Sequence, residues 1–363
     1  MYLKNLTDHE KEIFFILQKN GPMSKNDILK MTSIKSSNLN IIIKSLQKAE
    51  ILIESGQESS TGGRRPSLFD INTNYKYLIG IDISRSRMII VLTDIKMRIL
   101  QKKAISNRLG NEMTGQEALD ILCDAIQQIL NERGLTSECV LGIGIGVVGP
   151  VNRETGTIGE AYNPFAIGWS NLPVQQIMQE KTGCNIYVDH GTCAAVLGEY
   201  LYGRGSQYSS VSFFSCGVGI RSTHISSGAV IRALNGTEDS FAHTSINPMG
   251  ERCYCGKRGC VAAYASTPVI AENVRRRIKE GESSLLFGPV EKIEYLKIAK
   301  AAQEGDRICI DELVAAGTYF GMGLANYITL LNPALVVIGG RLAENSVLFY
   351  DAIVRSTMAR LYK

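Results

Sequence analysis

The sequence predicts an α/β protein in which a small N-terminal helical domain precedes two α/β lobes. Three observations predict this fold. Helix patterns and a basic glycine-rich loop fill the first part of the chain, strand and helix patterns alternate after it, and glycine-rich apolar strands recur in two separate halves. We expect domains at residues 1–71, 77–191 and 192–363, with the last segment either staying in the second lobe or returning to the first.

Two short helices open the N-terminal domain. Thr7 and Glu10 have the spacing of a capping box ahead of a first helix, which Gly21 and Pro22 end. A second helix begins after Ser24, and a turn over residues 32–35 leads to a third.

From about Ser36 this third helix has an apolar face and a polar face. The polar side chains are small hydrogen-bonding or cationic groups, which can contact base edges and phosphates in the major groove of DNA. The alternative is a solvated face on a small helical domain. The predicted groove-contacting residues are Ser36, Ser37, Asn38, Asn40 and Lys44, and the predicted inward stripe is Leu39, Ile42, Ile43 and Leu46.

Two strands around the loop ESSTGGRRP predict a wing. Arg64 and Arg65, on a frame of glycines and a proline, suit a narrow minor groove, where the negative potential of DNA is strongest. Three helices and a basic hairpin therefore favour a winged helix-turn-helix domain that binds DNA. A linker follows at residues 72–76.

The pattern changes from Tyr77. YLIGIDIS and MIIVLTDI are apolar strands, a third strand is expected near ILQKKAIS, and a helix over residues 115–132 leads to the buried strand VLGIGIGVVGP. Further strands with glycine turns follow in SSVSFFSCGVGIRSTHISSGAVI and ALVVIGGRLAE. Two such halves predict paired lobes around a cleft.

The composition disfavours several classes of protein. Charged residues make up 20% and hydrophobic residues 45%, and the net charge of +4 permits nucleic-acid binding without demonstrating it. No apolar run reaches the length of a membrane span, and the acidic N-terminus lacks the apolar core of a secretion signal. Six of the nine cysteines are scattered in apolar segments, so we expect reduced thiols in a cytoplasmic protein with no membrane partner.

The chain resembles the ROK family, which groups bacterial sugar-responsive repressors and sugar kinases on the actin-like ATPase (ribonuclease H-like) fold. The resemblance covers nearly the whole chain. Its motifs are the GGRRP hairpin, the GVVGPV strand, the AAVLGE helix, the segment HTSINPMGERCYCGKRGC and the strand NPALVVIGG. The N-terminal domain makes the chain similar to the family's glucose, N-acetylglucosamine and xylose repressors.

A metal site is predicted from His243, Cys253, Cys255 and Cys260. Four soft ligands within eighteen residues suit a closed tetrahedral Zn²⁺ site with no position left for catalysis. Chance clustering of reduced cysteines beside a core histidine is the alternative. The resemblance implies zinc at the same spacing, and we expect the ion to be structural.

The resemblance also shows what is missing. Kinases of the family carry Asn-Asp at a strand–helix junction, where the Asp deprotonates the sugar hydroxyl. The run AAVLGE fixes the register, so these residues fall on His190 and Gly191. Glycine cannot accept a proton, and Asp189 lies roughly 6–7 Å earlier along the strand. We therefore expect no catalytic residue and no enzymatic activity.

Two other sugar-binding carboxylates of the family are replaced by Ser240 and Ala262. If each charged hydrogen bond contributes about 1.5–3 kcal/mol, a relative's sugar would lose most of its affinity. We expect any effector, a sugar or sugar phosphate, between the lobes near Asn163, His190, Ser240 and His243.

The nucleotide-binding turns differ as well. Asp-x-Gly-Gly-Thr of the kinases is Asp82-Ile83-Ser84-Arg85-Ser86 here, and Gly-Thr-Gly-x-Gly is GVGIR ending at Arg221. Larger side chains stand where bare backbone would approach phosphate. Relatives usually continue past ARLYK with a strand and a helix that packs between the lobes, so the sequence leaves lobe closure open.

We expect a bacterial repressor of carbohydrate-use genes, such as those for xylose or another sugar. It would bind operator DNA as a homodimer or homotetramer, with an effector shifting lobe closure. Two alternatives stay open. An atypical ATP-dependent sugar kinase would release ADP with a sugar substrate, and an effector-independent DNA-binding protein, which the missing carboxylates favour, would show no thermal shift with sugars.

Overall fold

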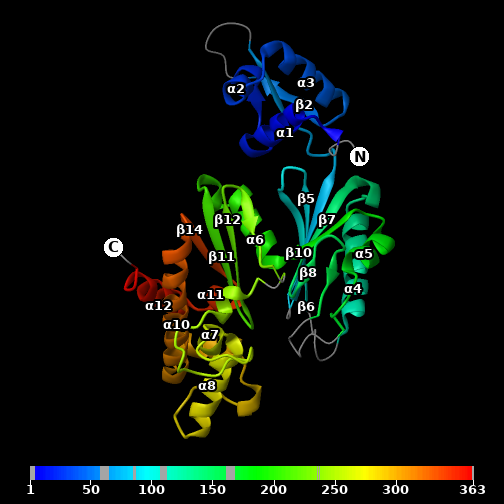
Figure 1. Ribbon diagram of the computed structural model, residues 1–363. Helices are drawn as coiled ribbons and strands as arrows, with labels where there is room; N and C mark the ends of the chain where they lie inside the picture. The colour runs from blue at the N-terminus through cyan, green and yellow to red at the C-terminus, as the bar shows by residue number, and fades with distance from the viewer. Residues whose placement is uncertain are drawn as a thin grey trace. The chain divides into compact units, whose positions relative to one another are not determined.

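The computed structural model describes residues 5–57, 65–84, 87–106, 113–160, 168–234, 236 and 238–361. The chain forms two compact units, Met1–Asp189 and His190–Lys363. Both units mix helices and strands, as the sequence predicts (Figure 1).

The N-terminal domain packs three helices against a three-stranded sheet. α1 (Asp8–Asn20) begins after Thr7, and the predicted capping box between Thr7 and Glu10 is present. The elements that follow are β1 (Met23–Ser24), α2 (Lys25–Met31), α3 (Ser36–Lys48), β2 (Leu52–Gln57) and β3 (Ser67–Ile71), in the sheet order β1-β3-β2. The core includes Ile13, Leu17, Ile28, Leu39, Ile43, Leu46 and Ile71, with Ile16 and Ile42 half-buried at its edge.

The rest of the first unit is a five-stranded mixed sheet with helices on one face. Its order is β10-β7-β4-β5-β6, with β4 parallel to β7 and antiparallel to β5. The strands are β4 (Tyr77–Ile83), β5 (Arg87–Asp94), β6 (Ile99–Ser106), β7 (Val140–Val147) and β10 (Ile186–His190), and β8 (Val151–Asn152) and β9 (Thr157–Ile158) form a separate pair. α4 (Gly115–Glu132), which spans the predicted residues, and α5 (Val174–Thr182) lie beside the sheet (Figure 1). A 3₁₀ turn, η2 (Ser137–Cys139), precedes β7.

The turn between β5 and β6 joins the N-terminal domain to this sheet. Ile95 is 1% exposed and belongs to the hydrophobic core of the N-terminal domain. The side-chain amide of Gln18 donates to the Ile95 carbonyl at 2.7 Å, and Lys96 forms an ion pair with Asp70. Core packing and polar contacts therefore hold the N-terminal domain in addition to the linker.

The second unit is built on a four-stranded sheet of order β13-β12-β11-β14, in which β14 runs parallel to β11. The strands are β11 (Ser210–Cys216), β12 (Ile220–Ser226), β13 (Ala229–Ile231) and β14 (Leu335–Gly339). The helices are α6 (Gly191–Tyr202), α7 (Ala262–Ala265), α8 (Thr267–Lys279), α9 (Tyr295–Gln303), α10 (Arg307–Leu331), α11 (Arg341–Asn345) and α12 (Val347–Met358), and the 3₁₀ turns are η3 (Arg204–Gln207), η4 (Ser240–His243) and η5 (Val290–Lys292).

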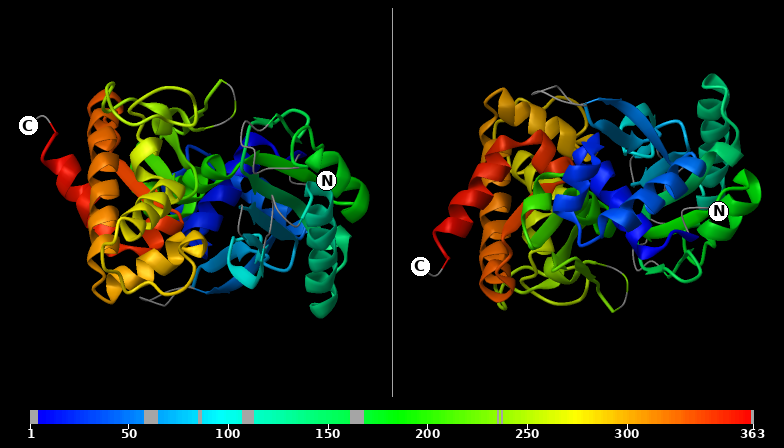
Figure 2. Two further views of the ribbon diagram at one scale, coloured as in Figure 1. Left: turned by 90° about the horizontal axis from the view of Figure 1, so that it is seen from below. Right: turned by 90° about the horizontal axis from the view of Figure 1, so that it is seen from above.

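α12 packs along α10 at very short range (Figure 2). A Cβ atom added at Gly317 would lie 2.5 Å from the Phe349 carbonyl oxygen, and one at Gly321 would lie 2.6 Å from the Ser356 Cβ. The Ser356 hydroxyl donates to the carbonyl of Thr318 at 2.7 Å. The described C-terminal segment thus packs within the second unit. This is one of the two arrangements that the sequence leaves open, the other being a return to the first lobe.

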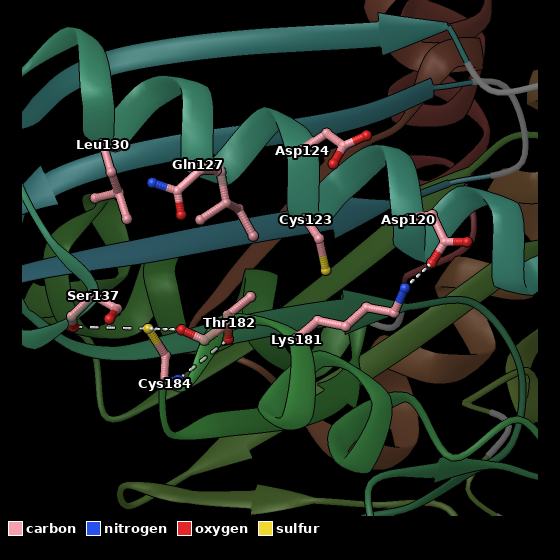
Figure 3. A pocket seen from close by; sticks show the side chains of 10 residues that line it. Asp120, Cys123, Asp124, Gln127, Leu130, Ser137, Lys181, Thr182 and Cys184 are labelled. Carbon is pink, nitrogen blue, oxygen red and sulfur yellow. Dashed lines mark hydrogen bonds and ion pairs between the residues drawn. The ribbon is translucent and has the colours of Figure 1, made fainter.

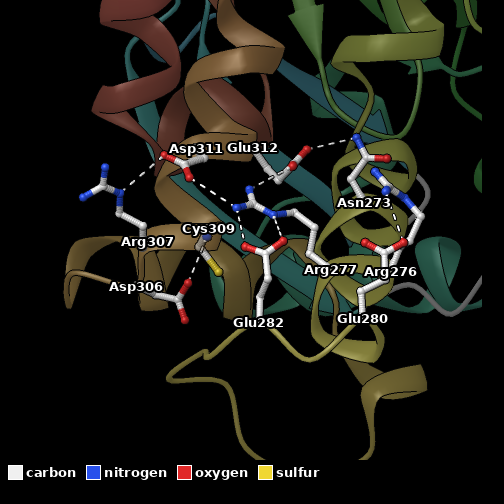
Figure 4. A network of polar contacts seen from close by, with 10 residues as sticks. All are labelled: Asn273, Arg276, Arg277, Glu280, Glu282, Asp306, Arg307, Cys309, Asp311 and Glu312. Carbon is white, nitrogen blue, oxygen red and sulfur yellow. Dashed lines mark hydrogen bonds and ion pairs between the residues drawn. The ribbon is translucent and has the colours of Figure 1, made fainter.

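Arg277 joins α8 to α10 through a network of charges (Figure 4). Its guanidinium lies 2.7 Å from Glu282, 3.2 Å from Glu312 and 3.4 Å from Asp311, and its side chain is only 19% exposed. Hydrogen bonds to these carboxylates, Glu282 foremost, raise the pKa of Arg277. The network fixes the loop after α8 against α10.

Among the helices in the described part of the chain, α10 alone has the length and apolar composition of a membrane-spanning helix. Much of its surface is buried inside the unit, including Phe320, Leu324 and Ala325. A buried core helix of a water-soluble fold meets the same criterion.

Candidate functional site

The polar face of α3 is exposed along its length. Leu39, Ile43 and Leu46 fix the opposite face in the core of the N-terminal domain. A helix held in this way can present its outer face to a DNA groove. The exposed residues include all five that the sequence predicts there: Ser36, Ser37, Asn38, Asn40 and Lys44.

Two residues that the sequence analysis missed extend this face. Lys25, at the start of α2, donates to the Asn40 side-chain oxygen at 2.7 Å and lies 5.3 Å from the centroid of the Phe69 ring. Ile41 is 68% exposed although it is large and apolar. The position of Ile41 outside the predicted inward stripe could have indicated from the sequence that this side chain is exposed. No pattern in the sequence links Lys25 to Asn40.

The hairpin after α3 has the predicted strands. β2 and β3 pair antiparallel up to the Gln57–Ser67 pair. Arg65 is exposed just before β3, and Arg64 lies outside the described residues.

The four predicted metal ligands come together in the second unit. One nitrogen or sulfur atom from each residue lies within 4.8 Å of the other three. The Cys253 sulfur is 3.6 Å from the His243 Nδ1, and the sulfurs of Cys255 and Cys260 are 3.7 Å apart. Tetrahedral Zn²⁺ with metal–sulfur bonds of about 2.3 Å separates neighbouring ligand atoms by roughly 3.5–4 Å, so this spacing fits a metal ion.

Two local features support this cluster. The His243 Nε2 lies 3.8 Å from the Asp239 carboxylate, and a carboxylate on the second ring nitrogen is the usual way to orient a metal-binding histidine. The sequence analysis did not identify Asp239. Gly259 has a φ of +70°, and a Cβ there would lie 1.6 Å from the Asn247 carbonyl oxygen, so only glycine fits before Cys260.

The strand–helix junction has glycine at the position of the expected base. β10 ends at His190, and Gly191 is the first residue of α6. The His190 Nδ1 caps α6 by accepting from the Thr192 amide at 3.3 Å. Asp189 forms an ion pair with Arg153 at 3.5 Å in the first unit.

His190 is 2% exposed, and its surroundings keep the imidazole neutral. Burial, followed by the charges of Arg221 and Arg232, lowers the pKa of His190 to about 3. The Thr192 hydroxyl lies 2.8 Å from its Nδ1 and accepts from the Thr223 hydroxyl at 2.9 Å. His190, Thr192 and Thr223 therefore form a buried hydrogen-bonded cluster.

The second nucleotide-type turn connects β11 to β12. The side chain of Arg221 folds back over this turn. Its Nη1 lies so close to Gly219 that a Cβ atom added there would be only 2.2 Å away. The Arg221 Nε is buried and has no hydrogen-bond partner among the described residues. In the first turn Ser84 bonds to the Arg87 carbonyl at 2.8 Å, and Arg85 lies outside the described residues.

The other predicted effector residues have different surroundings. Ser240 is exposed and His243 is half-buried, both in η4, while Ala262 is buried at the start of α7. Asn163 lies outside the described residues. The structure therefore brings Ser240 and His243 together and gives no position for Asn163.

A cavity of about 320 Å³ in the first unit involves none of the predicted residues (Figure 3). Lys181 and Asp120 form an ion pair of 2.6 Å at its edge, and burial raises the pKa of Cys123 to about 11. Thiols in such an environment are unreactive.

A helical N-terminal domain with an exposed polar helix precedes an α/β body that carries a histidine–cysteine cluster, an architecture typical of regulators built on an actin-like ATPase-type fold. The model of the ROK family matches residues 78–363, and the chain belongs to the ROK family.

Repressors are among its relatives. A xylose repressor from Caldicellulosiruptor bescii is 28% identical over 350 residues, which cover 94% of this chain and 86% of the relative. The DNA-binding transcriptional repressor Mlc from Escherichia coli K12 is 24% identical, covering 94% of this chain and 82% of the relative.

Solved structures confirm the fold. A ROK family transcriptional regulator, described as a homolog of the E. coli Mlc protein, has a TM-score of 0.80 at 24% identity and covers 98% of this chain and 88% of that one. A ROK glucokinase from Streptomyces griseus, in complex with glucose and AMPPNP, has a TM-score of 0.67 at 26% identity and covers 79% of this chain and 90% of that one. The body is thus of the actin-like ATPase type that ROK regulators and kinases share.

Proposed function

We propose that this protein is a DNA-binding transcriptional repressor of carbohydrate-use genes that acts in the bacterial cytoplasm. The observation that carries the proposal is the exposed polar face of α3 on a three-helix domain with an antiparallel hairpin. Support comes from relatives named as xylose repressors, which match the N-terminal domain as well as the body.

In this proposal the N-terminal domain is a winged helix-turn-helix. α3 enters the major groove, where Asn38 and Asn40 contact base edges and Lys44 contacts phosphate. Lys25 supports Asn40, and Ile41 offers an apolar contact for a thymine methyl group. The hairpin arginines, Arg64 and Arg65, enter the adjacent minor groove.

Binding to selected DNA tests this proposal. Operator sequences are selected from random duplexes with the full chain, and affinity is then measured by fluorescence anisotropy at fixed salt. Replacing Asn38 or Lys44 by Ala is expected to weaken binding about tenfold or more, and the Lys44 variant should also lower the salt dependence. Lys19→Ala, an exposed cation at the end of α1, is the matched control. Equal losses in all three variants, or no selected sequence, would reject the proposal.

The histidine–cysteine cluster is proposed to hold a structural Zn²⁺. Three thiolates and one imidazole occupy all four positions of a tetrahedral ion, so no position is left for a reacting ligand. When bound, the ion would supply cross-links within the loop between η4 and α7. Asp239 would not bind the metal itself but would orient the His243 ring through its contact with Nε2.

The body is proposed to lack kinase activity. Gly191 replaces the expected base, Asp189 is paired with Arg153, and Arg221 covers the second nucleotide-type turn. The similarity to a glucokinase makes an atypical kinase the rival function. Coupled ADP release across common hexoses and pentoses is expected to stay at background, with a ROK glucokinase assayed in parallel. Robust turnover would overturn this part of the proposal.

An effector, if it is a sugar or sugar phosphate, is proposed to bind near His190, Ser240 and His243, with Asn163 as a further contact. Loss of three carboxylates at Gly191, Ser240 and Ala262 disfavours neutral sugars. The second candidate function is a DNA-binding protein that acts without an effector. A thermal-shift screen of sugars and sugar phosphates distinguishes the two, because only an effector-responsive repressor should show a shift.

A further inference from the structure

Another cavity, of about 300 Å³, lies in the first unit where the N-terminal domain meets the five-stranded sheet. Its walls come from α1, β4, β7 and the turn after β5. This is roughly twice the volume of a cavity that binds benzene, and it is at the lower end of small-molecule sites. The apolar side chains that line it are Leu6, Phe14, Phe15, Leu78, Ile95 and Leu141.

One side of α1 forms the wall on the N-terminal domain. Its lining residues Lys11, Phe14, Phe15 and Gln18 are spaced three and four apart, so they lie on one side of the helix. Phe14 is 6% exposed, whereas Phe15 is 59% exposed and meets the Phe14 ring edge-on, with 5.6 Å between centroids. The Phe15 ring therefore keeps apolar surface that a ligand can cover.

The opposite wall contains a β-bulge. Leu141 is the extra residue of this bulge in β7, since neighbouring residues of β4 pair with Val140 and with Gly142. Bulges re-aim side chains and are common beside functional sites. Leu141 and, on β4, Leu78 are half-buried, so this wall also presents apolar surface.

The cavity is held open by contacts outside it. Ile95 packs in the core of the N-terminal domain, and the Gln18 amide donates to its carbonyl at 2.7 Å. The ion pair of Lys96 with Asp70 holds the same turn. A ligand would meet walls that are already in place, which lowers the entropy cost of binding.

Lys11 gives the cavity its charge. It is the one charged side chain among the described residues that line the cavity. Its ammonium lies 3.4 Å from Asp8, which is fully exposed, and an exposed ion pair of this kind contributes little free energy. The ammonium can therefore turn to an anionic group of a ligand.

We propose that this cavity binds a small aromatic acid, with the ring in contact with Phe15 and Leu141 and the carboxylate at Lys11. Aromatic rings favour edge-to-face contact with phenylalanine, and the lysine selects an anion. The loss of the sugar-binding carboxylates at Gly191, Ser240 and Ala262 agrees with an effector of another chemical class at another site.

The inference rests on the proposed function for its role. The ligand would contact α1 of the DNA-binding domain and the strands of the body at once, so it would favour one arrangement of this junction. Binding itself is testable without DNA.

Naphthoate is the probe, and neutral naphthalenemethanol, with the same rings, is its counterpart. Titration calorimetry of the full chain should give a dissociation constant for naphthoate below about 1 mM. Phe15→Ser should weaken both compounds about tenfold or more, since ring contacts are lost. Lys11→Gln should weaken naphthoate about fivefold or more and naphthalenemethanol by less than about twofold.

Two exposed residues of the same domain supply matched controls. Met31 is 51% exposed in α2, and Lys19 is an exposed cation near the end of α1. Met31→Ser and Lys19→Gln should each keep both dissociation constants within about twofold of wild type. Circular dichroism confirms that each variant is folded.

The regulatory role has its own measurement. Saturating naphthoate should change the affinity for selected DNA by about threefold or more in wild type and leave it unchanged in Lys11→Gln, since two coupled sites affect each other.

Absence of naphthoate binding, or binding that neither the Phe15 nor the Lys11 variant weakens, would overturn the proposed site. An unchanged DNA affinity in wild type would overturn its regulatory role. If naphthoate binds as expected and no DNA is selected, the proposed DNA-binding function fails and the site stands, so the two failures are distinguishable.

Discussion

Lys96 lies between the two carboxylate oxygens of Asp70, at 2.8 and 3.0 Å, and links the turn after β5 to the last strand of the N-terminal domain. The two side chains are only 13% and 15% exposed. Together with Ile95 in the core of the N-terminal domain, this pair makes the first unit a continuous structure rather than a domain on a tether.

Breaking this ion pair is expected to destabilise the first unit. Lys96→Ala or Asp70→Ala leaves the other charge partly buried without its partner, which should lower the free energy of unfolding by about 1–3 kcal/mol. Urea denaturation measures the loss, and the double variant should show a coupling energy of similar size. Lys102→Ala, an exposed lysine in β6, serves as the control. Fully additive losses would mean that the pair contributes no coupling.

Removing one ligand of the histidine–cysteine cluster is expected to remove the metal. Purified protein should contain about one Zn²⁺ per chain by mass spectrometry, Cys260→Ser should lose it, and Cys139→Ser, outside the cluster, should keep it. Hydrogen exchange should show faster opening of residues 245–260 in Cys260→Ser. A wild-type protein that neither contains nor takes up zinc contradicts the assignment.

His190 is expected to make the fold sensitive to mild acid. Its pKa is about 3 in the folded chain, below the ordinary 6.5. Between these two pH values the unfolded chain therefore binds a proton at this residue and the folded chain does not. Stability is therefore complete above about pH 6.5 and falls as the pH decreases toward 3, by about 2 kcal/mol from this residue at pH 5.

His190→Asn isolates this contribution, because asparagine can cap α6 and does not titrate. Urea unfolding at pH 7.5 and pH 5 should show a larger loss for wild type than for the variant. The wild-type loss must be compared with that of the variant, because burial also lowers the pKa of His224 and this residue contributes to the pH dependence of both proteins. Equal pH dependence in both proteins would show that His190 is protonated without cost.

Arg277 is expected to contribute far more to stability than its neighbour Arg276. Arg277 contacts three carboxylates and is 19% exposed, whereas Arg276 is 58% exposed and contacts Glu280 alone, at 3.5 Å. Arg277→Ala should cost about 1–3 kcal/mol and Arg276→Ala less than about 0.5 kcal/mol. Thermal unfolding compares the two, and similar shifts would contradict a structural role for the network.

The sequence predicts elements with strong local signals. The capping box at Thr7 and the helix over residues 115–132 are found where the patterns place them, and the four side chains predicted as metal ligands lie close together. Each depends on residues that are close together in the sequence, within a few positions for the helix signals and within eighteen for the histidine and the three cysteines.

Contacts between distant residues could not be predicted in this way. Ile95 packs in the core of a domain that the sequence predicts to end at residue 71. Hydrophobic periodicity does not say which core a residue joins, so it could not predict this contact. Asp239 beside His243, Lys25 beside Asn40 and Arg153 beside Asp189 likewise depend on tertiary structure.

The close approach of α10 and α12 has a consequence for how such a protein can change. Gly317 and Gly321 form a notch into which the backbone of α12 fits, so a single methyl group at either position would push α12 outward. Evolution could therefore shift the outer surface of this helix without altering any residue on it, through two buried glycines.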